Sequence, residues 1–348
     1  MDSEGAFRTS RLTRTTLDDV ARAAGVSPAT VSRCLNNPTI VSATLKAKVD
    51  DAIAELDYLP HGAARSLASR RSRMIGAVFP SLDSSLFGCA LEALQNEVAA
   101  GGYSLVVASS SYDPAREHAH IQTLVANGVD ALMLIGKSRA PEVDRLIQRK
   151  GIPCVLIWTS GSEQAFPCIG FDNAAAAAKI AHHLMDIGHR RIAVISGLVA
   201  GNDRAAARVA GIRTALEERG LSLPDERIVE RPFGVGEGRE AFRLLMTRQP
   251  RPTAVICGAE PFAYGAVFES QALGLAIPEA VSVTGFDDMW LAAQITPTLT
   301  TLRTPQREMG ALAGQFLLAV LAGEETVVPR PLPVELVVRQ SSGPPPTD

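Results

Sequence analysis

Apolar residues near the amino end recur at helical spacing. The first such stretch begins after Thr16, whose hydroxyl suits a helix N-cap, and it carries Leu17, Val20 and Ala24 on one face. Gly25 ends the stretch. The pattern therefore predicts a short helix over residues 17–24.

A second helix is predicted immediately afterwards. Ser27 is a good N-cap, Pro28 suits the first helical position, and Val31 and Leu35 form an inward face ahead of Asn36-Asn37-Pro38. Two helices that are separated by a few residues around a glycine must turn sharply. This geometry is that of a helix-turn-helix.

A third helix is predicted to start after Ser42 and to cover the first two. We expect an all-α DNA-binding domain over residues 15–60, preceded by a flexible basic N-terminus over 1–14. The apolar stripe of the third helix consists of Leu45, Val49, Ala52, Ile53 and Leu56.

The outward face of the second helix suits a DNA groove. Arg33 lies on this face, and its planar donor fork matches guanine O6 and N7 in a major groove. The alternative is a solvated arginine on a small helical bundle. The residues of this module that we expect at DNA are Thr16, Leu17, Ser27, Pro28, Ala29, Thr30, Ser32, Arg33 and Asn36.

From Met74 onward, short apolar strands alternate with helical stretches. This alternation predicts an α/β body with parallel sheets and helices on both faces, and the length allows two doubly wound halves. Ligands of such sheets bind beyond the carboxyl ends of the strands. The expected strands cover residues 74–79, 104–108, 131–135, 154–158, 191–196, 254–257 and 281–285.

Composition is that of a soluble protein with more than one domain. The 348 residues are 46% hydrophobic and 20% charged, which excludes a disordered, collagenous or membrane-spanning chain. No apolar run reaches membrane length and residues 1–14 lack a secretory signal, so we expect a cytoplasmic protein. The five cysteines lie far apart, and we expect buried free thiols rather than a disulfide or zinc framework.

Charge is segregated along the chain. The first 73 residues carry 11 Lys and Arg against 8 Asp and Glu, whereas the remainder carries 23 against 29. This pattern fits a basic head that is attached to an acidic body and that faces a polyanion. A solvated basic tail explains the charge count equally well.

The segment that follows the head, His61 to Ser69, has helical composition but only Leu67 as a large apolar residue. An isolated helix of this length is marginal in water, so we expect this hinge to become ordered only against a partner.

The residues now described resemble the lactose repressor family of bacterial transcription regulators. The resemblance covers about residues 15–340 and is carried by Leu17 to Asn36 (LDDVARAAGVSPATVSRCLN), by Tyr58 to Leu67, and by His189 to Ile192. It implies that the second helix reads a major-groove half-site of a near-palindromic operator and that the protein is a homodimer or a higher oligomer.

For the hinge and linker, residues 61–73, the resemblance implies a helix that pairs with its counterpart in the central minor groove. Leu67 matches the leucine that is inserted between base pairs, with Ala64 and Arg65 beside it at the DNA. A core leucine is the alternative for Leu67.

For the body, residues 74–340, the resemblance implies a periplasmic-binding-protein-like fold of two subdomains. Three crossing strands are expected near Asp172, Thr301 and Pro329. They give subdomains of about 74–171 with 302–329 and about 172–301 with 330–340, and a disordered tail over 341–348.

The resemblance also implies a small-molecule effector between the subdomains. The alternative interpretation of Phe87 and Phe233 is packing in the core. For Arg204 it is a solvated position on its helix. Two arginines on one helix face invite an oxyanion. The expected effector-binding residues are Phe87, Trp158, Arg204, Arg208, Phe233 and Asp287.

Short sequence segments that match one branch of the family indicate the class of effector. Pro80 to Leu82, Ile157-Trp158 and Asp203-Arg204 resemble the gluconate-type branch more than the purine branch, which favours a sugar or sugar acid. Ala259-Glu260 stands where an Asn-Asp pair is common, so one frequent hydroxyl partner is missing. Whether the effector releases or promotes DNA binding stays open, and a repressor is the expected role.

Two other classes are alternatives. A nucleotide-dependent enzyme would use Gly234 to Gly238 as a phosphate loop, but the spacing is not G-x-G-x-x-G and a turn is expected there. A periplasmic-type sugar-binding protein shares the body fold and lacks the head. We expect no catalytic residue, metal or cofactor.

Overall fold

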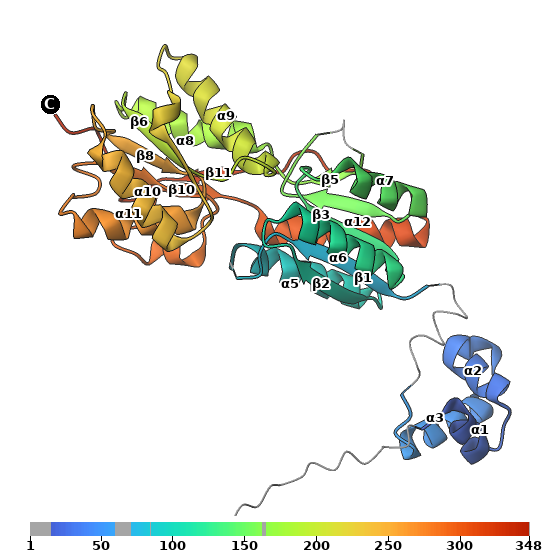
Figure 1. Cartoon of the computed structure of the whole chain (residues 1–348). Coiled ribbons are helices and arrows are strands. Elements are labelled where there is room, and N and C mark those ends of the chain that lie inside the picture. Colours follow the sequence, from blue (N-terminus) through green and yellow to red (C-terminus); the bar gives the residue numbers. More distant parts are fainter. Residues whose placement is uncertain (1–14, 60–70, 84, 162–164, 348) are drawn as a thin grey trace, which may run out of the picture. The chain divides into compact units, whose positions relative to one another are not determined.

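The structure is a computed structural model that describes residues 15–59, 71–83, 85–161 and 165–347. It divides into an amino-terminal unit that ends at Ser72 and a larger unit that begins at Arg73 (Figure 1).

The amino-terminal unit contains the predicted helix-turn-helix. Its helices are α1 (Leu17–Ala24), α2 (Pro28–Asn36), the 3-10 turn η1 (Pro38–Ile40) and α3 (Ala43–Glu55). Thr16 and Asp19 form a capping box at α1, and Gly25 ends α1 with φ 66°, a conformation that glycine adopts without strain. The shared core consists of Val20, Ala21, Val31, Cys34, Val49, Ala52 and Tyr58.

The first half of the larger unit is a parallel sheet of order β2-β1-β3-β4-β5. Its strands are β1 (Met74–Phe79), β2 (Ser104–Ser109), β3 (Ala131–Ile135), β4 (Cys154–Ile157) and β5 (Cys168–Ile169). Alternate strand residues pack on α5 (Ser85–Ala100) with α12 (Gln306–Ala322), and on α6 (Pro114–Ala126) with α7 (Pro141–Lys150). Figure 1 shows α12, late in the sequence, returning to this half.

The second half is a parallel sheet of order β7-β6-β8-β9. Its strands are β6 (Ile192–Gly197), β7 (Ile228–Arg231), β8 (Ala254–Cys257) and β9 (Ser282–Thr284). One face packs on α8 (Asn173–Asp186) and α9 (Asp203–Glu217), the other on α10 (Val235–Thr247) and α11 (Glu260–Ala272). Short 3-10 turns lie at η2 (Asp225–Arg227) and η3 (Trp290–Ala293). The two doubly wound parallel sheets are therefore confirmed.

The glycine-rich segment Gly234 to Gly238 is not the turn that the sequence suggested. Gly234 is the N-cap of α10 and the following residues form its first helical turn.

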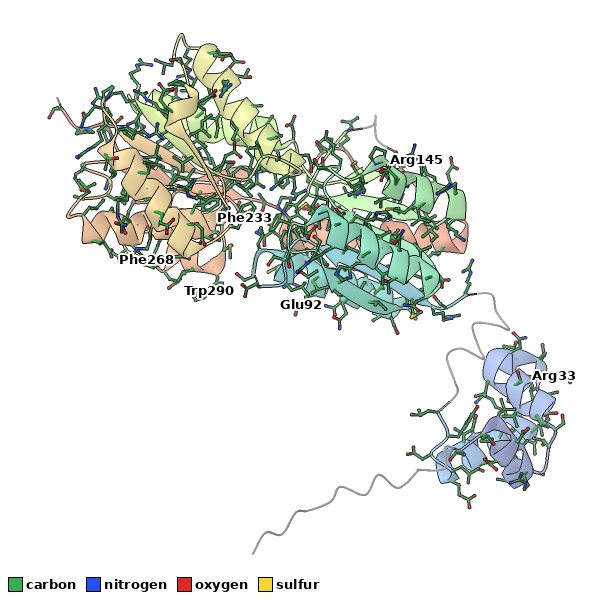
Figure 2. All side chains as sticks on the ribbon, in the orientation of Figure 1. Arg33, Glu92, Arg145, Phe233, Phe268 and Trp290 are labelled. Atoms are coloured by element: carbon green, nitrogen blue, oxygen red, sulfur yellow. The ribbon has the colours of Figure 1, made fainter. Side chains whose placement is uncertain are left out.

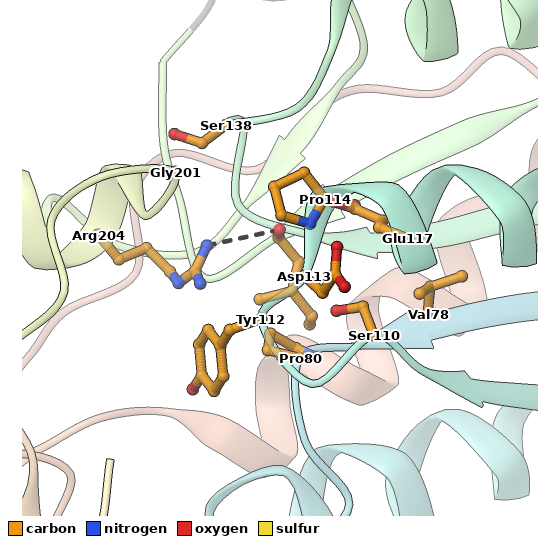
Figure 3. A pocket seen from close by; sticks show the side chains of 11 residues that line it. Val78, Pro80, Ser110, Tyr112, Asp113, Pro114, Glu117, Ser138, Gly201 and Arg204 are labelled. Atoms are coloured by element: carbon orange, nitrogen blue, oxygen red, sulfur yellow. Dashed lines mark hydrogen bonds between the residues drawn. The ribbon is translucent and has the colours of Figure 1, made fainter. Parts of the chain in front are cut away.

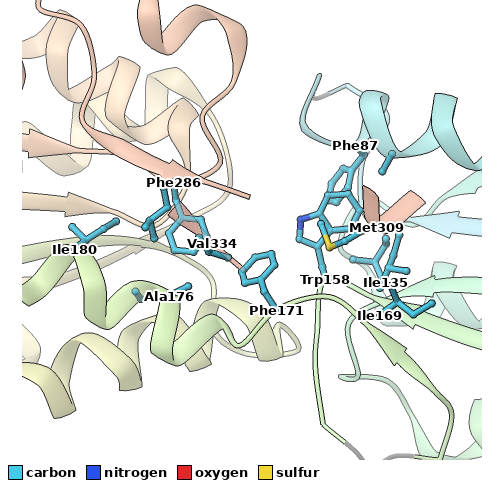
Figure 4. Packing of buried hydrophobic residues seen from close by; sticks show 14 of the residues in the cluster. Phe87, Ile135, Trp158, Ile169, Phe171, Ala176, Ile180, Phe286, Met309 and Val334 are labelled. Carbon is cyan, nitrogen blue, oxygen red and sulfur yellow. The ribbon is translucent and has the colours of Figure 1, made fainter. Parts of the chain in front are cut away.

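The chain passes between the halves along neighbouring segments. β10 (Thr301–Arg303) pairs antiparallel with β11 (Glu335–Val337), and the Leu332 amide donates a 2.8 Å hydrogen bond to the Gly170 carbonyl. Around these passages Phe171, Phe286 and Val334 belong to one buried apolar cluster that reaches both halves (Figure 4).

The expectation of a disordered tail is wrong for its first residues. Ser341 is fully buried: its hydroxyl donates to the Val283 carbonyl at 2.6 Å and accepts from the Thr300 amide at 2.8 Å. The Gly343 carbonyl accepts a 2.9 Å hydrogen bond from Nε2 of buried His189. Polar partners on β9, at Thr300 and at His189 hold this segment, and an apolar pattern would not show them.

All five cysteines are free thiols, as predicted. Four of them are buried, but Cys89 is exposed because it lies on the outer side of α5, away from Phe87 and Ala90.

Candidate nucleic-acid interface and effector site

The second helix of the head presents polar and small residues outward. The Ser27 hydroxyl caps α2 by accepting from the Thr30 amide at 3.2 Å, while Val31 and Cys34 point into the core. Pro28, Ala29 and Arg33 are exposed, whereas Thr30 and Ser32 are partly buried. This arrangement follows from the three-residue and four-residue spacing of the inward positions.

Arg33 extends from the outer side of α2 (Figure 2). Among the residues that the structure describes, its guanidinium has neither an ion-pair partner nor a hydrogen-bond acceptor, whereas the nearby Arg22 pairs with Asp19 at 2.9 Å. A donor fork without a protein partner on an exposed helix face is suited to base edges or phosphates.

The other predicted DNA residues are placed as follows. Thr16 is exposed at the N-cap of α1, Leu17 is partly buried against the core, and Asn36 is the last residue of α2. Ala64, Arg65 and Leu67 lie outside the described residues.

In the larger unit, one pocket between the halves collects most of the predicted effector residues. Phe87, Trp158, Arg204, Arg208 and Phe233 all line it, whereas Asp287 is not among the lining residues and interacts electrostatically with Arg208. The other residues of the lining are Leu86, Tyr112, Asn202, Ala205, Gly258 and Ala259.

Arg208 is the charged centre of the pocket. Its side chain is held by two hydrogen bonds, from Nε to Asn173 Oδ1 at 2.9 Å and from Nη1 to the Gly258 carbonyl at 2.6 Å. The guanidinium lies 3.7 Å from the centre of the Phe286 ring. Burial lowers the pKa of Arg208 to about 10, so the group stays charged at neutral pH. Nη2 has no hydrogen-bond partner among the described residues.

Asp287 is buried near Arg208, and burial raises the pKa of its carboxyl above the ordinary value. The positive charge of Arg208 and a 3.1 Å hydrogen bond from the Thr304 hydroxyl only partly offset this effect. Asp287 has φ 108°, a strained conformation for a residue other than glycine, and such strain concentrates at functional sites.

Aromatic rings line two sides of the pocket. The centres of the Phe87 and Trp158 rings lie 5.0 Å apart, edge to face, and Tyr112 stacks on Phe233 at 4.9 Å. Phe87 is both a core residue and a pocket residue, so the two interpretations of it are compatible.

Arg204 links the two halves. It is not the solvated arginine of the alternative interpretation, because its side chain is only 11% exposed. Its Nη1 donates to the Ile135 carbonyl at 3.4 Å and to Asp203 Oδ1 at 3.1 Å, and Asp203 Oδ1 also accepts from the Ser138 amide at 3.3 Å. Figure 3 shows Arg204 reaching a second pocket that Ser110 and Glu117 line.

Several residues of the site were not predicted from the sequence. Asn173 forms hydrogen bonds with Arg208 and the Trp158 carbonyl, and Tyr112 lines both pockets. Tyr112 follows a predicted strand, and this position could have identified it as a site residue. Asn173 begins a helix in an alanine-rich run, and no feature of the sequence there indicates a role in the site.

Among the described residues, no cluster of three or more His, Cys, Asp or Glu side chains could hold a metal ion. None of the described helices combines the length and the apolar character that crossing a membrane requires.

Comparison with known proteins agrees with this geometry. Residues 16–61 match the family model "Bacterial regulatory proteins, lacI family", and residues 181–342 match a periplasmic binding protein-like domain. The chain is 36% identical over 313 residues to the HTH-type transcriptional regulator GntR of Pseudomonas aeruginosa, covering 90% of this chain and 91% of that protein. It is 33% identical to the HTH-type transcriptional repressor PurR of Pectobacterium carotovorum, covering 87% and 89%.

Solved structures give the same result. The lac repressor dimer bound to operator and the anti-inducer ONPF superposes with a TM-score of 0.83 at 27% identity, over 95% of this chain and 99% of that one. The transcription regulator GntR of Chromobacterium violaceum superposes with a TM-score of 0.73 at 28% identity, over 77% and 99%.

A helix-turn-helix head joined to a two-lobed α/β body defines a DNA-binding transcription regulator. The chain belongs to the lacI family of bacterial regulatory proteins.

Proposed function

We propose that this regulator binds a near-palindromic operator as a homodimer and that a sugar or sugar acid, bound around Arg208, sets its operator affinity. The observation that carries the proposal is the Arg208 guanidinium, which Asn173 and Gly258 hold in a pocket lined from both halves. A ligand there contacts both halves at once and can favour one arrangement of them.

Operator binding is assigned to α2, with Arg33 as the base-reading residue. Pro28 and Ala29 carry no side-chain donor, so sequence preference must rely on Arg33, on the hinge and on DNA deformability. The resemblance assigns Leu67 to minor-groove insertion, with Ala64 and Arg65 beside it. The proposed domains are the head at 15–60, the hinge and linker at 61–73 and the effector-binding body from residue 74.

A dimer follows from the geometry of recognition. One head covers half of a palindromic site, and a two-fold axis doubles the length of sequence that is read. Phe268 on α11 (Figure 2) and Leu273 just after it are large apolar residues that are exposed. We assign them to the subunit interface of the dimer. The lac repressor structure with the matching fold is a dimer bound to operator.

The effector acts through differential affinity for two arrangements of the halves. A coupling of about 1 to 3 kcal/mol changes operator affinity about 5- to 150-fold, with either sign. A further structural neighbour is the complex of the transcriptional regulator CelR with cellobiose, which superposes with a TM-score of 0.69 at 28% identity. That complex supports a carbohydrate ligand for this body fold. We assign no catalytic role to the protein. We place it in the cytoplasm, where the operator lies.

The test combines DNA binding with ligand screening. Purified full-length protein is titrated with an operator duplex selected from a random pool, with and without a panel of sugars and sugar acids. One or more panel members should shift operator affinity at fixed salt concentration. The Arg208→Ala variant should keep operator binding and lose that shift; a shift of unchanged size would refute the assignment of Arg208.

A further inference from the structure

We propose that the second half of the body carries a further ligand site, separate from the pocket around Arg208, and that this site binds a phosphate group. The site is a cavity of about 150 Å³ with Arg227 and Arg248 in its wall. Its ligand is inorganic phosphate or the phosphate group of a small phosphomonoester. The inference goes beyond the proposed function and does not depend on it.

The cavity lies at the opposite edge of the sheet from the pocket around Arg208. Arg227 directly precedes β7, and Arg248 lies in the loop that leads from α10 to β8. Phe233 and Gly258, which line the pocket around Arg208, follow the carboxyl ends of the same two strands. Both strands pair in parallel with β6, so their amino ends share one edge. A ligand between Arg227 and Arg248 therefore does not compete with the effector for space.

The two guanidiniums of the cavity have no partner within the protein. In the part of the chain that the structure describes, neither Arg227 nor Arg248 has a side-chain hydrogen bond or an ion pair, and the Nε of Arg248 is buried. Asp225, two residues before Arg227, is instead paired with Arg213 at 2.7 Å. A positive charge that is partly removed from water and unpaired attracts an anion more strongly than a fully solvated one.

The wall of the cavity has a net positive charge. Glu226 is the one acidic residue among the described lining residues, and it is exposed, so that water and salt screen its charge. Ser222 and Gln249 also line the cavity, and neither side chain has a hydrogen-bond partner among the described residues. Both can donate hydrogen bonds to a ligand without breaking a bond within the protein.

The number of donors favours a phosphate group over a carboxylate. An esterified phosphate presents three strong acceptor oxygens, so it can accept hydrogen bonds from both arginine forks and from a neutral donor at once. The volume is sufficient as well, because one water molecule needs only about 10 to 15 Å³ of such a cavity. Leu245 and Pro250 are apolar parts of the wall, against which the carbon chain of an ester can pack.

The test is calorimetry of full-length protein in a phosphate-free buffer. Sodium phosphate and glycerol 3-phosphate should both bind, whereas sodium chloride at equal ionic strength should not. Tighter binding of glycerol 3-phosphate would identify a phosphomonoester as the ligand, and equal affinities would show that the phosphate group alone is recognised.

The variants remove the charged donors of the cavity. The double variant Arg227→Gln, Arg248→Gln should weaken the binding of both compounds about 10-fold or more, because hydrogen bonds from charged donors are lost. Arg227→Gln alone should weaken it about 3-fold or more. This single variant leaves the carboxyl end of α10 unchanged and gives the answer if the double variant does not fold.

Two control variants locate the binding. Arg251→Gln removes an exposed arginine of the same loop that does not line the cavity, and Arg208→Ala alters the other pocket. Both should bind phosphate like the wild type. The proposal is overturned if neither phosphate compound binds more than chloride, if Arg227→Gln binds like the wild type, or if either control variant loses as much affinity as Arg227→Gln. Operator titration of the same samples reports separately on the proposed function.

Discussion

Arg208 on α9 and Asn173 on α8 form a buried hydrogen bond of 2.9 Å from Nε to Oδ1. The amide nitrogen of the same Asn173 donates to the Trp158 carbonyl, also at 2.9 Å. Asn173 lies at the start of α8, directly after the N-cap Asp172, and joins a residue of the first half to one of the second. Only a side chain with one donor and one acceptor group can serve both partners.

Replacement of Asn173 by Leu should therefore affect stability and ligand binding together. Arg208 Nε would lose its acceptor and the Trp158 carbonyl its donor, at a cost of about 1 to 3 kcal/mol in unfolding free energy. Chemical denaturation measures the first effect, and calorimetry with the effector measures an affinity loss. Unchanged values for both would mean that Asn173 does not position Arg208.

Arg33→Ala should weaken specific operator binding by about 1 to 3 kcal/mol, because the variant lacks the base-reading fork. Binding to random duplex should change much less. Fluorescence anisotropy with both duplexes at one salt concentration gives the two values. The matched variant Arg22→Ala removes an exposed arginine that is already paired with Asp19. Equal losses for specific and random DNA would assign Arg33 to phosphate contact instead.

Gly136→Ala should loosen the contact between the halves. Gly136 has φ 67°, and a Cβ atom there would lie 1.8 Å from Arg204 Nη1 and 2.5 Å from Asp203 Oδ1. The hydrogen bond from Arg204 to the Ile135 carbonyl cannot persist beside this Cβ atom. We expect a more open body, visible as a larger radius of gyration in X-ray scattering, and an altered effector affinity. Gly151→Ala, also at positive φ but with open space around it, is the control.

Glu260 should make stability depend on pH. Burial raises its pKa to about 7 from an ordinary value of 4.5, despite hydrogen bonds from Tyr264, Thr301 and Met289 that lower it. The folded protein then binds a proton more tightly than the unfolded chain, so stability falls as pH rises through this window. Glu260→Gln should lack this fall, and its melting temperature relative to the wild type should rise between about pH 5 and 7.

The contribution of Glu269 to stability depends on pH with the opposite sign. Hydrogen bonds from Arg243 and Arg239 lower its pKa, so its contribution is present at neutral pH and is lost as pH falls through the lowered value. If the melting temperatures of wild type and Glu260→Gln differ by the same amount at every pH, Glu260 does not titrate as predicted.

Local chemistry made the elements predictable. Thr16, Ser27 and Ser42 mark helix starts because each hydroxyl caps an amide that the helix leaves unpaired. The strands at 74–79 and 254–257 match their predicted bounds, since each is a continuous apolar run buried on both faces.

The effector site was predictable only in part. Trp158 and Arg208 follow from strand ends and from the resemblance, whereas Asn173 acts through hydrogen bonds to Arg208 and Trp158 that arise only when the halves pack. Ser341 was missed for a similar reason, because its partners Val283 and Thr300 are distant in sequence. Pairings of this kind leave no periodic signal in the chain.

The proposed function requires that the head binds a specific duplex under the control of a ligand near Arg208. Duplexes are selected from a random pool with full-length protein, and the enriched duplex is titrated with and without sugar acids. We expect a near-palindromic sequence whose affinity a sugar acid changes about 5-fold or more in wild type and not in Arg208→Ala. Failure to enrich any sequence over random competitor would contradict it.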